Sequence, residues 1–418
     1  MSVEVPERKE LLRLVDVARY GDAWCPDSSG SDGMRGGALH LSAVLPALSC
    51  AIGHPVATAV HHDPAAVQRA LGIPDADSAI VVLIDGLGYW NLQLRLGHAP
   101  YLRSLMGEPV NQRPISTCAP STTAAAMATF GTGTCPGLTG MTGYTQRNPE
   151  TGELAQLIQF RNSISPLYLQ RQPTVFESLA ARGVRVTSSG LPKFEDSALT
   201  RAALRGADYR SGSAPRDLVR VACSAAGEPG LTYLYLRDID KIGHNYGWNS
   251  DRWVAAFERI DAQLGALRRM APSGTLIVIV ADHGMVSSSV GQRVDIARVP
   301  ELADGVGLVG GEPRSVMLYA KDGVDPADIV RRWRGFFGTR ALVRTRQEAV
   351  AQGVFGPVEA RVLPMIGDVL VSAGESDDGE SVTVVDTRSQ TDKATRLPSV
   401  HGSQSMMEMD IPCLIDIA

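Results

Sequence analysis

Two uninterrupted apolar runs in this 418-residue chain stop abruptly at an aspartate. SAIVVLI (78–84) leads into Asp85 and a glycine, and LIVIV (276–280) leads into ADHG, which contains Asp282 and His283. A run without polar alternation indicates a strand covered on both faces, as strands are in a parallel sheet. Open α/β sheets present ligand-binding side chains at the carboxyl ends of such strands. The two runs therefore predict an α/β fold with polar side chains gathered at one sheet edge.

The rest of the chain supports this fold class, because β-type and helix-like sequences alternate along it. GVRVTSSG (183–190) follows the helix-like ESLAARG, and LTYLYLRD (231–238) is joined to the run at 276–280 by the helix-like stretch 251–270. Strands that alternate with helices indicate crossover connections. We therefore expect a largely parallel central sheet flanked by helices.

Three segments depart from this alternation and suggest the domain organisation. Residues 1–38 include the Gly-, Ser- and Asp-rich sequence WCPDSSGSDGMRGG, which predicts a flexible N-terminal extension. Residues 39–418 are expected to form the main globular domain. Within it, residues 135–230 begin with a Gly- and Thr-rich stretch and are predicted to form a lid-type segment, and residues 290–395 are predicted to form a smaller α+β insertion.

Composition and charge exclude several functional classes. A net charge of -5 and a pI of about 5.9 leave no basic footprint for nucleic acid or for an anionic membrane. No apolar stretch is long enough to span a membrane, and the first residues, MSVEVPERKELLRL, lack the apolar core of a secretory signal. We therefore expect a cytoplasmic protein. The six scattered cysteines contain no CxxC pair and are expected to be reduced thiols.

Two further motifs contribute side chains of the kind that bind divalent metals. In DKIGH, Asp240 and His244 are four residues apart, so on a helical turn both lie on one face and can share a cation. VHGSQS contributes His401. Each motif alone has an ordinary interpretation as a helix start, a turn or a loop histidine. Their occurrence together with the two strand-end motifs favours a metal-binding site.

In their order along the chain, these motifs resemble those of the alkaline phosphatase superfamily, and more closely its type I nucleotide pyrophosphatase/phosphodiesterase branch. The resemblance extends from about Leu39 to the C-terminus and rests on VVLIDGLG, APSTTAAAMATFGTG, DKIGHNYG, VIVADHGM and HGSQSMMEMDIPCLI. It implies an alkaline-phosphatase-like catalytic domain over residues 39–418 and a metal-dependent hydrolase.

The resemblance also implies roles for individual residues. The nucleophile of such enzymes lies nine residues before the Thr of a Thr-Gly pair, which indicates Thr123 when counted from Thr132, and the adjacent Thr122 remains an alternative. Two metal ions are implied, zinc with manganese as the alternative. One ion would be held by Asp240, His244 and His401, and the other by Asp85, Asp282, His283 and the Thr123 oxygen.

Elementary chemistry agrees with these roles. A threonine hydroxyl is a weak nucleophile near neutral pH and needs a metal ion to stabilise its alkoxide. Thr123 also lies near an expected helix start, which favours anions. One position departs from the branch, which usually carries Asn three residues after the nucleophile, because this chain has Ala126 there. Lys241, Lys193 and Tyr144 are the candidates for the substrate contact that this amide would make.

Together these observations predict a metal-dependent hydrolase of phosphodiester or nucleotide pyrophosphate bonds, acting on a small-molecule substrate. Because no arginine is identified beside the motifs to meet the extra charge of a monoester, we expect diesters to be preferred. The alternatives are a phosphonoacetate-type C–P hydrolase, a phosphomonoesterase and an inactive metal-binding relative. A phosphomutase is disfavoured because no long cap with mutase-like motifs is evident. A sulfatase is disfavoured because CAPST around Cys118 lacks the arginine of the sulfatase motif.

Overall fold

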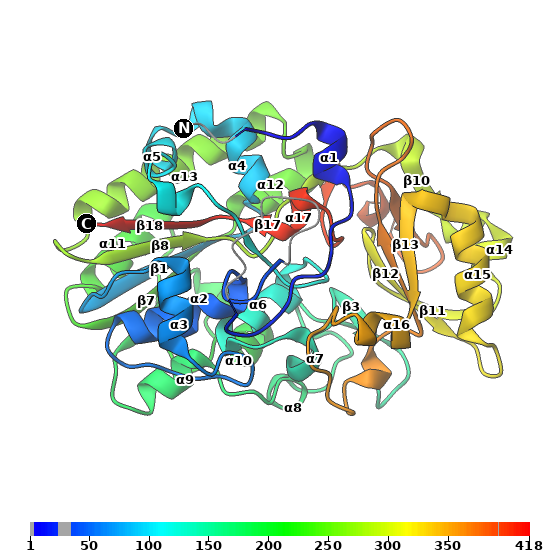
Figure 1. The fold of residues 1–418 in the computed structure, drawn as a ribbon, viewed down its shortest axis with the longest axis horizontal. Helices are drawn as coiled ribbons and strands as arrows, with labels where there is room; N and C mark the ends of the chain where they lie inside the picture. Colours follow the sequence, from blue (N-terminus) through cyan, green and yellow to red (C-terminus); the bar gives the residue numbers. More distant parts are fainter. Residues whose placement is uncertain (1–3, 24–34, 392) are drawn as a thin grey trace.

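A six-stranded sheet forms the centre of the molecule in the computed structural model (Figure 1), which describes residues 4–23, 35–391 and 393–418. The pairings from β8 to β6 are parallel, and β18 runs antiparallel to β8. The predicted α/β class with a largely parallel sheet is confirmed. The strand order is β18 (Cys413–Ile417), β8 (Leu276–Val280), β1 (Ser78–Ile84), β7 (Gly230–Leu236), β5 (Val186–Gly190) and β6 (Asp208–Ser211).

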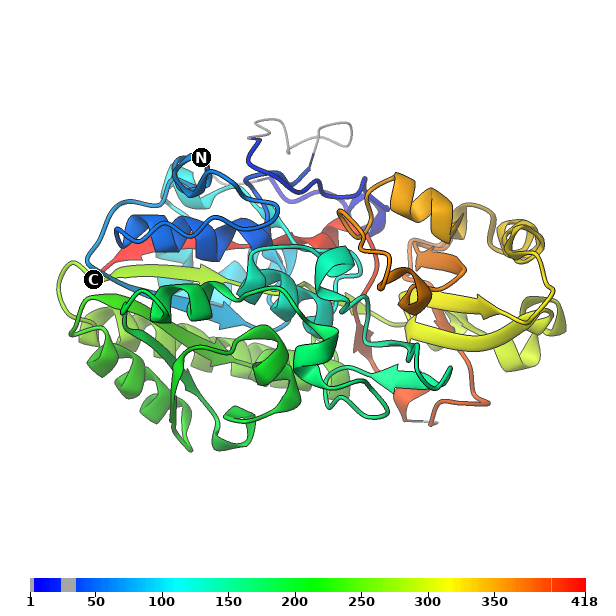
Figure 2. The ribbon, with the colours of Figure 1, turned by 90° about the horizontal axis from the view of Figure 1, so that it is seen from below.

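The apolar runs lie in the middle of this sheet because helices cover both of its faces. Every residue of β1 and β8 is buried. Figure 2 shows the N-terminal helices on one side of the sheet and helices from the middle of the chain on the other. The first group includes α2 (Leu41–Ala51) and α3 (Pro64–Leu71), and the second includes α11 (Pro215–Ala225) and α13 (Asp251–Met270).

A smaller unit, the cap (residues 293–385), lies beside this main domain (Figure 1). Helix α15 (Pro326–Phe337) packs on its sheet through the buried side chains of Trp333 and Phe337, which gives the cap its own apolar core. A hairpin of β3 (Thr145–Arg147) and β4 (Leu154–Gln156) contacts the cap at β11. The antiparallel cap sheet has the order β11 (Val306–Glu312), β12 (Ser315–Ala320), β14 (Val369–Ala373) and β13 (Ala341–Thr345).

The predicted extension, lid-type segment and insertion lie in different parts of the fold. In the predicted extension, α1 (Arg8–Leu12) buries Leu11 and Leu12, whereas the Gly- and Ser-rich residues 24–34 lie outside the described residues. In the predicted lid segment, β3 and β4 lie beside the cap, whereas β5 and β6 continue the parallel pairing of the central sheet. The cap lies within the predicted insertion. The division of the chain into extension, lid and insertion remains a proposal.

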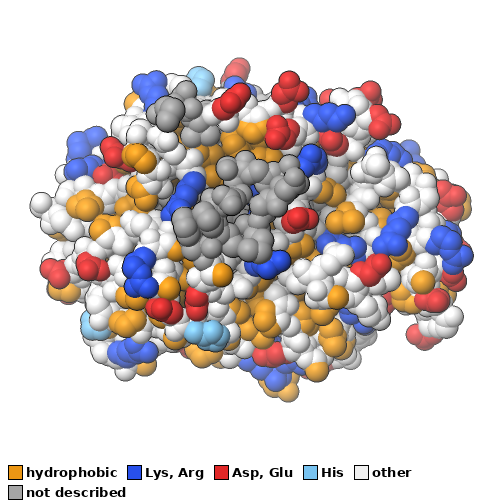
Figure 3. Space-filling model, in the orientation of Figure 1, with side chains coloured by type: hydrophobic (Ala, Val, Ile, Leu, Met, Phe, Trp, Pro, Cys, Tyr) orange, Lys and Arg blue, Asp and Glu red, His pale blue; other side chains and the backbone are white. Residues whose placement is uncertain are grey.

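Three further properties of the described residues are their helix hydropathy, their surface charge and the state of their thiols. No helix in the described part of the chain is long and apolar enough to cross a membrane. On the face drawn in Figure 3, basic and acidic side chains are intermixed. Burial raises the pKa of the Cys118 and Cys135 thiols to about 12, which keeps them protonated and unreactive. The free cysteines are Cys50, Cys118, Cys135, Cys223 and Cys413.

Helix α6 (Thr123–Thr132) packs so closely on α10 (Ala198–Ala203) that Gly131 has no room for a side chain. A Cβ there would lie 1.7 Å from the carbonyl oxygen of Ala203. We expect Gly131→Ala to lower the free energy of unfolding by about 1–3 kcal/mol, as overpacked substitutions do. Chemical denaturation measures this change, and an unaltered midpoint would contradict the packing.

Gly335→Ala in α15 is the matched control for this substitution. Nothing lies within 4 Å of the Cβ position of Gly335, and alanine is more favourable than glycine inside a helix by about 1 kcal/mol. The control should therefore leave stability unchanged or raise it.

Candidate functional site

The parallel pairing of β1 with β8 brings the ends of the two apolar runs to the same sheet edge. Asp85 follows β1, Asp282 and His283 follow β8, and all three side chains are buried. The amides of Gly86 and His283 both donate to Asp282 Oδ1, each at 3.0 Å, and fix that oxygen. Gly86 has a φ of +76°, a conformation that favours glycine, and this tight turn directs the chain across the edge.

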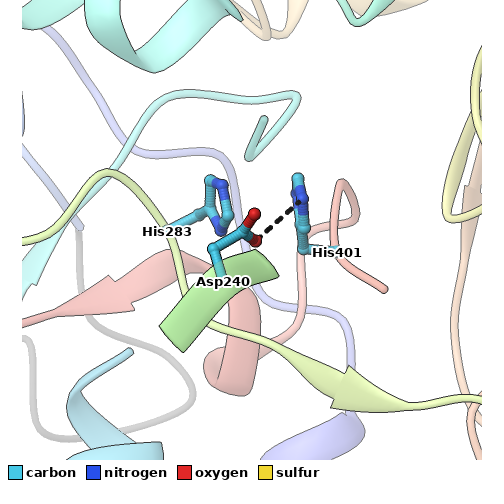
Figure 4. Close-up of side chains that lie close together, drawn as sticks. All are labelled: Asp240, His283 and His401. Carbon is cyan, nitrogen blue, oxygen red and sulfur yellow. Dashed lines mark ion pairs between the residues drawn. The ribbon is translucent and has the colours of Figure 1, made fainter. Parts of the chain in front are cut away.

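Helix α12 (Asp238–Tyr246) supplies a second pair of polar side chains beside that edge. Asp240 and His244 lie one helical turn apart, with His244 Nε2 3.3 Å from Asp240 Oδ1. His401 lies in a loop before the C-terminal strand, and its Nε2 is 3.9 Å from Asp240 Oδ1 and 3.2 Å from His244 Nε2. Figure 4 shows Asp240, His283 and His401 converging from three separate segments.

The ligand atoms of these side chains form two overlapping groups, and within each group all atoms lie within 4.8 Å of one another. The ring of His283 stacks on that of His401 with the centroids 3.6 Å apart. The second group contains His283 where the sequence predicted His244, but His244 contacts both other members. The first group is Asp85, Asp282 and His283, and the second is Asp240, His283 and His401.

The orientation of these side chains fits divalent metal ions. One oxygen of each carboxylate is buried without a hydrogen-bond partner, namely Asp85 Oδ1, Asp240 Oδ1 and Asp282 Oδ2. Each imidazole has its Nδ1 close to a backbone carbonyl, which can only accept a hydrogen bond, so Nδ1 carries the proton. The Nε2 lone pairs therefore face the cluster, as they do in metal-binding histidines. The carbonyls belong to Gly284 for His283 (3.1 Å), Ser399 for His244 (2.8 Å) and Ser121 for His401 (2.8 Å).

The electrostatics of the cluster also favour a cation. Burial and two neighbouring carboxylates raise the pKa of Asp85 well above its usual range, although Tyr235 donates a hydrogen bond to its other oxygen. Burial and two adjacent imidazoles lower the pKa of His401 well below its usual range. A divalent cation attracts carboxylates and binds imidazole in its neutral form. The chemistry of the cluster is therefore that of a site for cations.

Of the two candidate threonines, the structure brings Thr123 to the ligand groups. Its hydroxyl lies 3.1 Å from His283 Nε2, at the first residue of α6. Thr122 precedes the helix in an extended conformation and is 2% exposed. Ala126, where the branch usually has Asn, is fully buried in α6 and cannot contact a substrate.

A cavity of about 1170 Å³ extends from the ligand groups toward the cap. Of the predicted substrate contacts, Lys193 and Tyr144 line it, whereas Lys241 is exposed and is not among its described lining residues. Burial and the charges of Arg237 and Lys241 lower the pKa of Lys193. Apolar and aromatic lining side chains include Leu154, Ile158, Phe194, Leu199 and Tyr209.

The expectation that no arginine lies near the motifs is wrong, because Arg237 lines this cavity. Its guanidinium lies 5.6 Å from the ring centroid of Phe194. The signal for it was present in LTYLYLRD. Side chains two residues apart on a strand share a face, so Tyr235, which contacts Asp85, and Arg237 at the strand end point the same way.

Comparisons with known proteins show a family match and similar folds. The sequence model described as "Type I phosphodiesterase / nucleotide pyrophosphatase" matches residues 79–351. A phosphopentomutase of Methylorubrum extorquens is 32% identical over 135 residues, which are 32% of this chain and 33% of that protein. The chain thus matches about a third of the length of this curated relative.

Two solved structures have a similar fold. Phosphonoacetate hydrolase from Sinorhizobium meliloti 1021, in complex with phosphonoformate, is 21% identical with a TM-score of 0.62, and the match covers 82% of this chain and 90% of that chain. Murine ectonucleotide pyrophosphatase / phosphodiesterase 5, as an inactive variant in complex with AMP, is 15% identical with a TM-score of 0.59, and the match covers 81% and 87%. At these identities the likeness concerns the fold.

The family match covers about two thirds of the chain and includes the segments that carry Asp85, Thr123, Asp240 and Asp282. The predicted resemblance is therefore confirmed. This chain belongs to the type I phosphodiesterase / nucleotide pyrophosphatase family, a metal-dependent branch of the alkaline phosphatase superfamily.

Proposed function

We propose that this protein hydrolyses phosphodiester or nucleotide pyrophosphate bonds, with Thr123 as the nucleophile and two divalent metal ions as cofactors. The observation that carries the proposal is the distance of 3.1 Å between the Thr123 hydroxyl and Nε2 of His283, the imidazole common to both ligand groups. The proposed ligands of one ion are Asp85, Asp282 and His283, and those of the other are Asp240, His244 and His401.

The proposed reaction has two steps, attack by the Thr123 oxygen and hydrolysis by water. The Thr123 oxygen attacks phosphorus, the ester or anhydride oxygen on the opposite side leaves, and water then hydrolyses the threonine phosphoester. Divalent ions in the two ligand groups would stabilise the threonine alkoxide and the charge on the phosphoryl oxygens. The first N–H groups of α6 favour the same anion, because a helix N-terminus carries partial positive charge.

We propose zinc as the metal, with manganese as the alternative. The cluster combines three imidazoles with three carboxylates, and zinc binds both imidazole nitrogen and carboxylate oxygen. A site for magnesium or calcium would be built from oxygen ligands alone.

The shape and charge of the cavity favour a substrate with a bulky, anionic leaving group. Its volume of about 1170 Å³ slightly exceeds the usual range of about 300–1,000 Å³ for small-molecule sites, and its apolar wall suits an organic group much larger than that of phosphonoacetate. Arg237 and Lys193 lie on this wall and flank the same ring, that of Phe194. Together they can bind a second anionic group, as a nucleotide provides.

A C–P hydrolase of the phosphonoacetate type is the second candidate. The observation in its favour is the same pair of cations, since Arg237 and Lys193 would also suit a carboxylate next to the scissile bond. Arg237 likewise weakens the argument against phosphomonoesters. The size of the leaving group separates these substrates experimentally.

The first prediction concerns metal content. Protein purified without chelator should contain about two divalent ions per chain, because a two-metal site needs both ligand groups. His401→Ala should lose about one of them and most of the activity while its circular dichroism stays unchanged. His54→Ala is the matched control, since His54 is exposed and lies outside the ligand groups. Full activity in metal-free protein, measured after elemental analysis, would contradict the proposal.

The second prediction concerns the nucleophile. Thr123→Ala should lower kcat by about 1000-fold or more with the metal content retained, because a covalent nucleophile is lost while protein ligands remain on each ion. Thr123→Ser should keep measurable activity, since a hydroxyl survives. Thr122→Val should cost only about tenfold. An inactive Thr122 variant with an active Thr123 variant would move the nucleophile by one residue, and two active variants would indicate direct attack by water.

The third prediction concerns the substrate. The ratio kcat/KM should be higher for bis-p-nitrophenyl phosphate than for p-nitrophenyl phosphate or phosphonoacetate. Arg237→Ala should raise KM for ATP by about tenfold, as expected when a charge-assisted hydrogen bond is lost, and should change the diester far less. Arg220→Ala, on the exposed face of α11, is the control. A preference for phosphonoacetate would favour the second candidate function.

A further inference from the structure

The tip of the β11–β12 hairpin carries a buried carboxyl group from the cap into the candidate site. Glu312 pairs with Ser315 across the end of this hairpin. Glu312 is 6% exposed and lines the cavity together with Thr122, Thr123 and His401. Its sequence neighbourhood, GGEPR, contains no metal-ligand or catalytic pattern, so the sequence alone does not indicate a role for this residue.

The Glu312 side chain contacts three segments of the main domain. Its Oε2 accepts a hydrogen bond from the Tyr144 amide (2.8 Å), and the Thr122 side chain lies close enough to lower the pKa of the Glu312 carboxyl group. Its Cγ packs against the backbone of Gly402, where an added Cβ would lie only 2.5 Å away. Its Oε1 is buried without a hydrogen-bond partner. Three separate segments thus meet at one side chain.

Two of these segments carry the proposed nucleophile and a proposed metal ligand. They are the nucleophile segment (residues 120–123) and the His401 loop (residues 401–405). The Ser121 amide donates to the Gly402 carbonyl (3.1 Å), and the His401 imidazole donates to the Ser121 carbonyl (2.8 Å). Glu312 lies beside both segments where these bonds join them.

The protonation of Glu312 suits this position. Burial and the nearby Glu408 carboxylate raise its pKa, whereas the hydrogen bond from the Tyr144 amide lowers it. The resulting pKa is about 8. At neutral pH the group is therefore mainly a neutral acid, which can both donate and accept hydrogen bonds. It adds little negative charge beside three carboxylates and an anionic substrate.

We propose that Glu312 is a positioning residue, by which the cap holds the nucleophile segment against the His401 loop and so aligns the Thr123 hydroxyl with the ligand groups. The inference rests on the proposed function, because the effect of Glu312 is on turnover at Thr123. A residue that only packs the cap onto the main domain would change stability without a specific change in kcat.

The test compares Glu312→Ala and Glu312→Gln in the full-length, metal-loaded protein with bis-p-nitrophenyl phosphate as substrate. Glu312→Ala should lower kcat by about 10- to 100-fold with KM changed by less than about threefold, because small misplacements of a reacting group reduce the rate by such factors. Glu312→Gln should keep most of the activity, since its amide oxygen can still accept from Tyr144. Metal content should stay intact in both variants.

Asp368→Asn is the matched control in the cap. Asp368 is a half-buried carboxylate that pairs with Arg346 and accepts a hydrogen bond from the Ala320 amide (2.9 Å), and the structure gives it no contact with the nucleophile segment or the His401 loop. It should keep the kcat of the unaltered protein. An unchanged kcat in Glu312→Ala, or an equal loss in Asp368→Asn, would overturn the inference.

A double-mutant cycle with Thr122→Val tests whether Glu312 acts through Thr122. If it does, the double variant should lose little more kcat than Glu312→Ala alone, whereas independent roles give losses that multiply and would refute the proposal. Glu312→Leu, which fills the space without hydrogen bonds, replaces Glu312→Ala if the alanine variant does not fold.

Thr123→Ala separates the proposed function from the inference about Glu312. Full activity of Thr123→Ala would contradict the proposed function. An inactive Thr123→Ala variant together with fully active Glu312 variants would contradict only this inference.

Discussion

The concentration of three carboxylates and three imidazoles at one buried sheet edge is the constraint on which the rest of the structure depends. Burial and the neighbouring carboxylates both raise the pKa of Asp85, and an unpaired buried charge costs several kcal/mol. Hydrogen bonds hold these groups in place. They include the bonds that all three imidazoles donate to backbone carbonyls. A cation bound to this edge would relieve the repulsion, and its binding energy would then become part of the folding energy.

The sequence was sufficient for those parts of the fold that depend on local pattern. The unbroken apolar runs before Asp85 and Asp282 predicted two buried strands of a largely parallel sheet, and β1 and β8 are such strands and pair in parallel. The spacing of Asp240 and His244 predicted one helical face, and α12 brings their side chains within 3.3 Å. Both features depend on the periodicity of one segment and on the common direction of parallel strands, which a sequence reveals directly.

Other parts of the site depend on which segments meet, and local pattern carries no such information. The stacking of His283 on His401 follows from the path of a loop that returns from the cap, so the sequence could not show that His283 would lie between the groups. Glu312 reaches the site from a hairpin of a separate sheet. Arg237 was a different case. The alternation of LTYLYLRD places its side chain on the same face as that of Tyr235, but Arg237 belongs to none of the metal-ligand motifs and was therefore overlooked.

The ligand groups draw on widely separated parts of the described chain, from Asp85 after β1 to His401 shortly before β18. This arrangement has a consequence for synthesis on the ribosome. A nascent chain can fold much of its central sheet while the second ligand group is still incomplete, because His401 is synthesised after all the other proposed ligands. Long-range contacts of this kind form late in folding. The full complement of metal ligands, and with it hydrolytic competence, would therefore arise only once translation has passed the His401 loop.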